Sequence, residues 1–128
     1  MSSSLPDIFG ADPVQPKWQI VRGDTATMRI EFLQDDEKTY YDTTGWTYRS
    51  STYDLKGSVL NSLQVSHGDG YVEITALPSI TSTWGTGYKQ ISSELLFDIE
   101  VTTSDNRVWT PVIGNIVVLS DVSGVNIP

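Results

Sequence analysis

Apolar and polar residues alternate with a period of two along most of this chain. Between residues 26 and 32, apolar side chains occupy every second position, and polar or charged side chains occupy the positions between them. Similar alternation recurs at residues 46–53, 71–76 and 95–102. A period of two places the two sets of side chains on opposite faces of an extended strand. Each segment is therefore predicted to be a β-strand with one buried face.

The last part of the chain contains the clearest strand pair. Residues 95–102 are followed by Ser104-Asp105-Asn106 and then by a second alternating segment, which predicts a hairpin. Pro111 and Gly114 interrupt the returning strand, so we expect a bulge or an edge position near them. The apolar run at residues 116–119 is typical of a strand that is buried on both faces.

Two further strand candidates, at residues 17–22 and 59–65, complete a series of short extended segments separated by turn sequences. His67-Gly68-Asp69-Gly70 is a typical turn, because its two glycines can adopt positive φ. Pro78 should end the strand before it, and residues 79–84 are the one stretch that could form a helical turn. Roughly six to eight short strands with at most one helical turn predict an all-β fold, an antiparallel β-sandwich of the immunoglobulin-like type.

The first 16 residues differ in composition from the rest of the chain. Three prolines and three consecutive serines disfavour both helix and strand in this segment. It nevertheless carries four apolar residues that a free tail would not normally contain: Leu5, Ile8, Phe9 and Val14. We therefore expect residues 1–16 to be an extended arm that packs either on its own domain or on a neighbouring subunit. Residues 17–128 are expected to form a single β-sandwich domain.

The composition argues against several classes of partner. The 128 residues include 16 acidic and 8 basic side chains, which give a formal net charge of −8. Nucleic acids and anionic membranes both bind basic surfaces, so neither is expected as a partner. No segment approaches the roughly 20 apolar residues of a membrane helix, and the first residues lack the basic and apolar regions of a secretory signal.

Residues suited to catalysis or metal binding are sparse. The chain has no cysteine and a single histidine, His67, so neither a sulfur-based zinc site nor a catalytic triad is predicted. Asp98 and Glu100 share one strand face, where two acids are usually solvated. The acidic sequence Asp35-Asp36-Glu37 could attract Ca²⁺, but it lacks the ligand spacing of an EF-hand. We therefore expect no enzymatic activity, no cofactor and no metal site.

Two short glycine-containing motifs are interpreted as turns. Gly85-Thr86-Gly87 does not lead from a strand into a real helix, so it is not expected to hold a phosphate group. Arg22-Gly23-Asp24 matches an integrin-binding tripeptide, but a match of three residues between two strands is interpreted as a coincidence of turn chemistry.

The four tryptophans admit two interpretations. Flat aromatic side chains can form a sugar-binding platform, and they also pack well in cores and at protein–protein interfaces. Trp46 begins the inward face of its strand and is assigned to the core. We favour core or interface packing for the tryptophans. The candidate assembly contacts are the apolar residues of the arm together with two tryptophans: Leu5, Ile8, Phe9, Val14, Trp84 and Trp109.

Several motifs resemble a module that recurs in tailed-phage proteins. Residues 20–25 read Ile-Val-Arg-Gly-Asp-Thr, and residues 42–47 read Asp-Thr-Thr-Gly-Trp-Thr. Residues 96–101 and the Gly-x-Ile-x-Val sequence at 114–118 match the closing hairpin of that module. Together these motifs make residues 17–123 similar to the N-terminal domain of phage baseplate upper proteins, a β-sandwich that anchors receptor-binding parts to the tail.

Two departures limit what this resemblance implies. The module usually has leucine where this chain has Thr43, and the sequence stops at Pro128 with no stalk or receptor-binding domain after it. The resemblance therefore implies an adaptor or covering subunit, and receptor binding is not carried over.

We therefore expect a structural, non-enzymatic bacteriophage protein from the tail, baseplate or tail-fibre attachment region. It would be made in the cytoplasm of the bacterial host and reside in the virion, where its partners are other structural proteins and further copies of itself. A capsid decoration or cement protein is the first alternative, since a small acidic sandwich would suit a head lattice equally. A carbohydrate-binding module that uses an exposed Trp84 or Trp109 is the alternative from another class.

Overall fold

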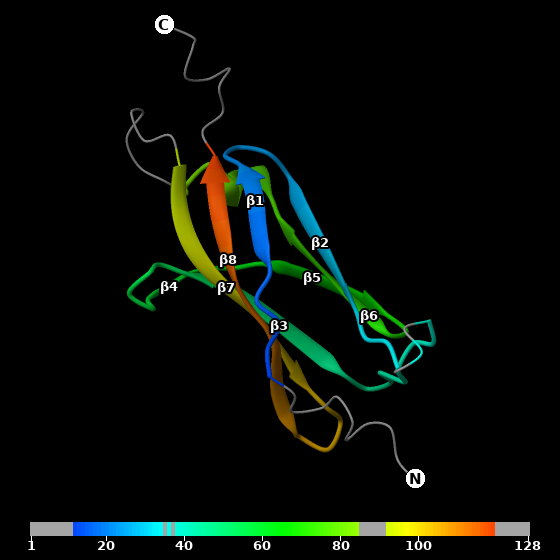
Figure 1. The fold of residues 1–128 in the computed structure, drawn as a ribbon. Coiled ribbons are helices and arrows are strands. Elements are labelled where there is room, and N and C mark those ends of the chain that lie inside the picture. Colours follow the sequence, from blue (N-terminus) through cyan, green and yellow to red (C-terminus); the bar gives the residue numbers. More distant parts are fainter. Residues whose placement is uncertain (1–11, 35, 37, 85–91, 120–128) are drawn as a thin grey trace, which may run out of the picture.

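Eight strands and one short helix form the described part of the computed structural model, which comprises residues 12–34, 36, 38–84 and 92–119 (Figure 1). The strands are β1 (Lys17–Val21), β2 (Ala26–Glu31), β3 (Thr47–Tyr53), β4 (Val59–Ser62), β5 (Gln64–Gly68), β6 (Tyr71–Ala76), β7 (Ser92–Thr102) and β8 (Val108–Leu119). The helix is α2 (Pro78–Thr81), close to the predicted helical turn.

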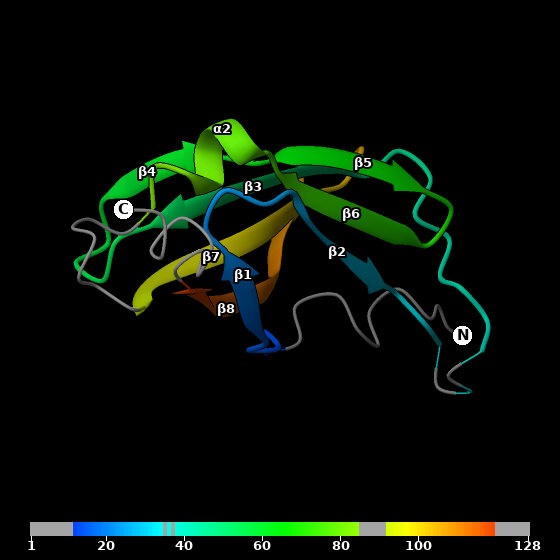
Figure 2. The same cartoon turned by 90° about the horizontal axis from the view of Figure 1, so that it is seen from above.

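The strands form two sheets. One has five strands in the order β1-β8-β7-β3-β4, and the other has three in the order β2-β6-β5; β1 and β8 are parallel, and all other pairs are antiparallel. Figure 2 shows β2, β6 and β5 on one side and β1, β8 and β7 on the other. An immunoglobulin-like sandwich places strands B, E and D in one sheet and C, F and G in the other. Because β2-β6-β5 and β3-β7-β8 divide in this way, the predicted immunoglobulin-like β-sandwich is confirmed.

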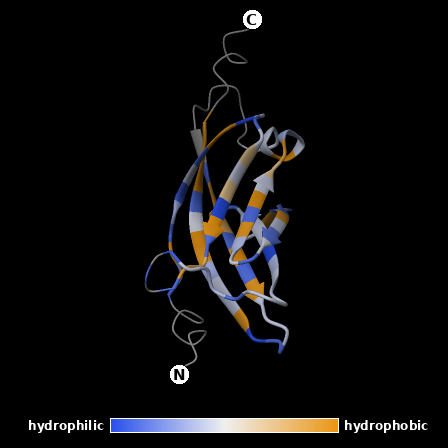
Figure 3. Ribbon diagram, turned by 90° about the vertical axis from the view of Figure 1, so that its right-hand side faces the viewer, coloured by the Kyte–Doolittle hydropathy of each residue, from blue (hydrophilic) through white to orange (hydrophobic). Residues whose placement is uncertain are grey.

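The core lies between the sheets and follows the alternation of the sequence, which is visible as orange and blue bands along the strands (Figure 3). On β6, Val72 and Ile74 are completely buried, and on β7, Phe97 and Ile99 are completely buried as well. The ring of Phe97 packs 5.5 Å from that of Trp18 on β1. The predicted inward faces of both strands are therefore confirmed.

The segment from 59 to 65 is not the single strand that was predicted. β4 belongs to the five-stranded sheet and β5 to the three-stranded sheet, and the chain crosses between them at Leu63. The Leu63 side chain is buried, and its backbone N–H donates to the carbonyl oxygen of Ser50 at 2.9 Å. Leu63 and Val65 are apolar and alternate with Gln64, as in one continuous strand, so the break is not visible in the sequence.

Helix α2 holds the turn between β1 and β2. Pro78 occupies the first helical turn, where its missing N–H costs nothing, so it begins a helix besides ending the extended segment before it. The fully buried hydroxyl of Thr81 accepts from the N–H of Gly23 at 3.1 Å and donates to the carbonyl oxygen of Asp24 at 2.8 Å. Gly23 has φ +93°, so Arg22-Gly23-Asp24 has a structural role in this turn.

Strand β8 confirms one prediction and contradicts another. A register shift opposite residues 99–101 produces a bulge next to Pro111, as expected, but β8 is flanked by β7 and β1 and is no edge strand. The prediction that residues 116–119 are buried on both faces is wrong. Ile116 and Val118 are buried, whereas Val117 and Leu119 are only half-buried, because they lie on the outer face of the sheet.

Replacing Thr81 with valine removes both hydrogen bonds at nearly constant side-chain shape. We expect the free energy of unfolding to fall by about 1–3 kcal/mol, because buried polar partners lose their hydrogen bonds. Urea unfolding followed by tryptophan fluorescence measures the change. The control is Thr83→Val on the exposed side, where we expect a change within about 0.5 kcal/mol. Equal effects of the two substitutions would show that the turn does not depend on Thr81.

Candidate assembly surfaces

The described part of the arm, residues 12–16, lies along β8 of its own domain. The N–H of Val14 donates to the carbonyl oxygen of Pro111 at 2.9 Å, and the N–H of Ile113 donates to the carbonyl oxygen of Val14 at 3.1 Å. Asn115 donates in the same way to Pro16 at 3.0 Å. The Val14 side chain is nevertheless 57% exposed. Residues 12–16, which precede β1 in the chain, thus continue its pairing along β8. Leu5, Ile8 and Phe9 lie outside the described residues.

Gly114 makes this close approach possible. A Cβ atom at this position would lie 2.4 Å from the carbonyl oxygen of Pro16 and 2.8 Å from Cε1 of Phe97. Since real Cβ atoms do not approach backbone oxygen so closely, a larger side chain would displace either the arm or the core. The glycine of the Gly-x-Ile-x-Val motif is therefore required where the arm meets the sheet.

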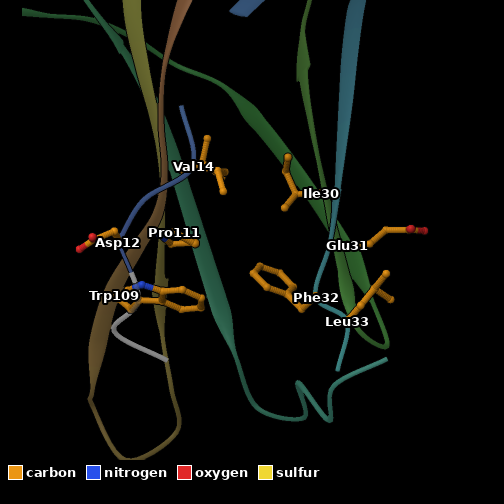
Figure 4. Close-up of a pocket in the computed structure, with 9 residues that line it drawn as sticks. Asp12, Val14, Ile30, Glu31, Phe32, Leu33, Trp109 and Pro111 are labelled. Atoms are coloured by element: carbon orange, nitrogen blue, oxygen red, sulfur yellow. The ribbon is translucent and has the colours of Figure 1, made fainter. Parts of the chain in front are cut away.

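An apolar groove of about 260 Å³ opens between the arm and β8 on one side and β2 on the other (Figure 4). It is lined by Asp12, Val14, Ile30, Glu31, Phe32, Leu33, Trp109, Pro111 and Val112. The rings of Phe32 and Trp109 lie 6.1 Å apart at an angle of 52°. The carboxylates of Asp12 and Glu31 point away from the groove, so its interior is apolar (Figure 4).

The predicted assembly contacts separate into three groups. Val14 and Trp109 both line the groove. Trp84 is only 3% exposed, and its indole N–H donates to Oδ1 of Asn61 at 2.7 Å, so the expectation that it is exposed is wrong. A hydrogen-bonded indole is stable in the interior, and the sequence alone does not identify its partner. The three arm residues lie outside the described part of the chain.

Among the described residues, the single histidine lies beside an aromatic ring. His67 is an exposed residue of β5, one position before the end of the strand, and its ring lies 5.1 Å from that of Tyr48. Burial raises the pKa of the Tyr48 phenol. The turn itself is at Asp69-Gly70. No group of three or more His, Cys, Asp or Glu side chains that could bind a metal occurs among the described residues.

The two acids on β7 face outward, as predicted, and both bind β3. Asp98 accepts from the Tyr53 hydroxyl at 2.9 Å and from the backbone N–H of Ser51 at 3.2 Å. Glu100 forms an ion pair with Arg49 at 2.7 Å. Burial, with the neighbouring carboxylate as a further cause, raises the pKa of Tyr53. Both acids therefore connect neighbouring strands and are not arranged as an acid–base pair.

Of the acidic sequence at 35–37, the structure describes only Asp36, and Asp35 and Glu37 lie outside the described residues. The Asp36 carboxylate accepts from the hydroxyl and the backbone N–H of Thr39, at 2.5 and 2.8 Å, and from the N–H of Lys38 at 2.9 Å. These hydrogen bonds lower the pKa of Asp36. Gly85-Thr86-Gly87 also lies outside the described residues.

The turn at residues 42–45 is built on local hydrogen bonds. Asp42 accepts from the hydroxyl of Thr44 at 2.6 Å and from its backbone N–H at 3.0 Å, and these bonds lower the pKa of Asp42 below its usual 3.8. Gly45 has φ +80°, and the buried Trp46 follows it. The Asp-x-Thr-Gly-Trp sequence therefore sets the entry into β3.

Comparisons with known proteins add little to this description. No model of a known protein family matches the sequence, and no curated protein matches it. The chain is similar to a solved structure described as the ZIG-8-RIG-5 IG1-IG1 heterodimer, with 13% identity and a TM-score of 0.35 over 81% of this chain and 83% of that chain. A similarity of this size carries no argument, so the fold assignment depends on the strand order. The described residues include no helix long and apolar enough to cross a membrane.

Replacing Asp42 with alanine should give a pH-dependent loss of stability. The folded-state pKa lies below the unfolded one, so Asp42 stabilises the fold above pH ~4 and loses this effect as the pH falls through the folded-state value. We expect Asp42→Ala to unfold at lower urea concentration than the wild type at pH 7, with a difference that shrinks below pH ~4. Thr44→Val should reproduce part of the effect. A difference independent of pH would refute this role of the carboxylate.

Replacing Gly114 with alanine should disrupt the contact between arm and sheet. We expect the free energy of unfolding to fall by about 1–3 kcal/mol, as in other overpacked sites, because the new Cβ meets a backbone oxygen. Thermal unfolding measures the change. The control is Val108→Ala on the same strand, where a 58% exposed side chain should change stability by about 0.5 kcal/mol or less. An unperturbed Gly114→Ala protein would mean that the arm does not lie where it is described.

Proposed function

We propose that this chain is a structural, non-enzymatic subunit of a bacteriophage particle, in the tail, baseplate or tail-fibre attachment region. Its partners are other virion proteins and further copies of the chain. The observation that carries the proposal is the arm, whose residues 12–16 are held along β8 by main-chain hydrogen bonds beside an apolar groove. The sequence before Asp12 adds three apolar residues, Leu5, Ile8 and Phe9. Apolar side chains on an extended segment gain burial only against another surface.

The groove supports a binding role over a catalytic one. Its volume of about 260 Å³ is slightly below that of small-molecule sites, which usually occupy roughly 300–1,000 Å³. Its interior is apolar, and the two carboxylates at its margin, Asp12 and Glu31, point outward (Figure 4). Such a groove suits one or two apolar side chains of a protein better than a polar substrate.

The phage-like motifs support the proposal at the level of the domain. Gly23 and Gly45 have positive φ, and Gly114 admits the arm, so these glycines lie where the backbone requires them. The resemblance to the N-terminal domain of phage baseplate upper proteins thus involves residues that build the sandwich and its arm. We infer the location in the tail from this resemblance.

The arm can be tested at constant length by replacing Leu5, Ile8 and Phe9 with serine. We expect incorporation into phage particles to fall at least about tenfold, because burying three such apolar side chains against a neighbouring subunit would contribute several kcal/mol. Quantitative immunoblotting of purified particles measures incorporation, and circular dichroism checks that the sandwich is intact. The control replaces Ser2, Ser3 and Ser4 with alanine and should leave incorporation unchanged.

Normal incorporation of the serine variant would contradict the role of the arm. The location is tested on the same particles by labelling separated heads and tails with an antibody. Label on the tails supports the proposal, whereas label confined to the heads would favour a capsid decoration protein and overturn the location in the tail.

A further inference from the structure

The outer face of the five-stranded sheet carries an apolar stripe. Outward positions follow from the register, since Leu96 lies between the buried Leu95 and Phe97 on β7, and Val117 between the buried Ile116 and Val118 on β8. Val21 pairs with Leu119, and Tyr53 pairs with Leu96. The stripe consists of Val21, Tyr53, Leu96, Ile113, Val117 and Leu119, all half-buried except Ile113, which is 45% exposed.

The outer face of the other sheet is polar by comparison. Arg29 on β2 lies 3.2 Å from Glu31 and 3.6 Å from Glu73, and its guanidinium covers the ring of Tyr71 at 3.7 Å. Thr27 and Thr75 share a hydrogen bond on the same face. This face is suited to water, so the two outer surfaces of the sandwich differ in chemistry.

Two pairs of polar side chains beside the apolar residues of the stripe are hydrogen-bonded to each other. The amide nitrogen of Asn115 donates to Glu94 at 2.6 Å, and the Tyr53 hydroxyl donates to Asp98 at 2.9 Å. A surface whose polar groups keep their hydrogen bonds is covered at a lower desolvation cost than one whose polar groups lose them. The stripe can therefore be buried against a second apolar surface without leaving these groups unsatisfied.

The charge of this face favours a second copy as the partner. The outward positions of β1, β8, β7 and β3 hold two basic residues, Lys17 and Arg49, and three acidic ones, Glu94, Asp98 and Glu100. The face is thus nearly neutral in a chain of net charge −8, so two copies would meet there with little repulsion. A two-fold axis parallel to the strands would bring Lys17 on one side toward acids of β7 on the other.

We propose that two copies of this chain pair face to face through the outer surface of the five-stranded sheet, with Ile113 and Val117 at the centre of the contact. Sheet faces pack in this way when each presents apolar side chains, as the two sheets within the sandwich do. Pairing also explains why residues 116–119 are apolar on both faces of β8. The inference goes beyond the proposed function and concerns the isolated chain, so either can fail without the other.

Sedimentation velocity of the full chain tests the pairing. We expect a reversible dimer, and Ile113→Lys and Val117→Lys should each weaken it at least about tenfold, since a symmetric interface carries every substitution twice. Lysine lowers the net negative charge, so general repulsion decreases and cannot explain the loss. Ser66→Lys is the control, because Ser66 is exposed and pairs with Glu73 on the outer face of the three-stranded sheet, in the other sheet of the sandwich from the stripe. Thermal unfolding checks that each variant is folded.

Engineered cysteines give a second measurement, which is clean because the chain has none of its own. Under mild oxidation, Val117→Cys should form an intermolecular disulfide readily, and Ser66→Cys should form one much more slowly. A wild-type chain that is monomeric at about 1 mM, where even weak pairs associate, would overturn the inference. Dimers that persist in both lysine variants of the stripe, or that Ser66→Cys links as fast as Val117→Cys, would overturn it as well.

Discussion

Strand β8 imposes the constraint on which the rest of the structure depends. It pairs with β7 on one side, and on the other with β1 and residues 12–16 of the arm. Its inner side chains, including Ile116 and Val118, are buried in the core, and Gly114 admits the arm. A shift of one residue in its register would turn the core side chains outward and place a side chain against the arm. The core, the arm and the outer face are therefore fixed together.

The distinctive features of the described residues lie on the surfaces of the sandwich. Asp98 and Glu100, the acids that a sequence search would examine first, join β7 to β3, and Asp42 and Asp36 stabilise turns. What the described residues leave toward solvent is an apolar groove beside the arm and an apolar stripe across one sheet. Both features suit contacts with protein.

The sequence predicts the strands well because a period of two reports directly which side chains enter the core, as at Val72 and Phe97. It fails where a tertiary contact decides. Leu63, at the crossing between the sheets, is apolar and buried, and no glycine or proline marks the crossing, so 59–65 has the pattern of one strand. Trp84 is buried because Asn61 accepts its N–H, a pairing that no local pattern encodes. Val117 is half-buried because it lies on the outer face of the sheet, and an apolar run does not by itself show that one of its faces is the outer one. The sequence predicts Val14 and Trp109 as contact residues, but only the fold shows that both line the same groove.

A density map of the assembled phage particle at side-chain resolution is the most direct measurement of whether this chain acts through its surfaces. We expect its sandwich in the tail or baseplate, with the arm and the outer face of the five-stranded sheet buried against other chains. A particle that lacks the chain, or a map in which both surfaces face solvent, would contradict the proposed role.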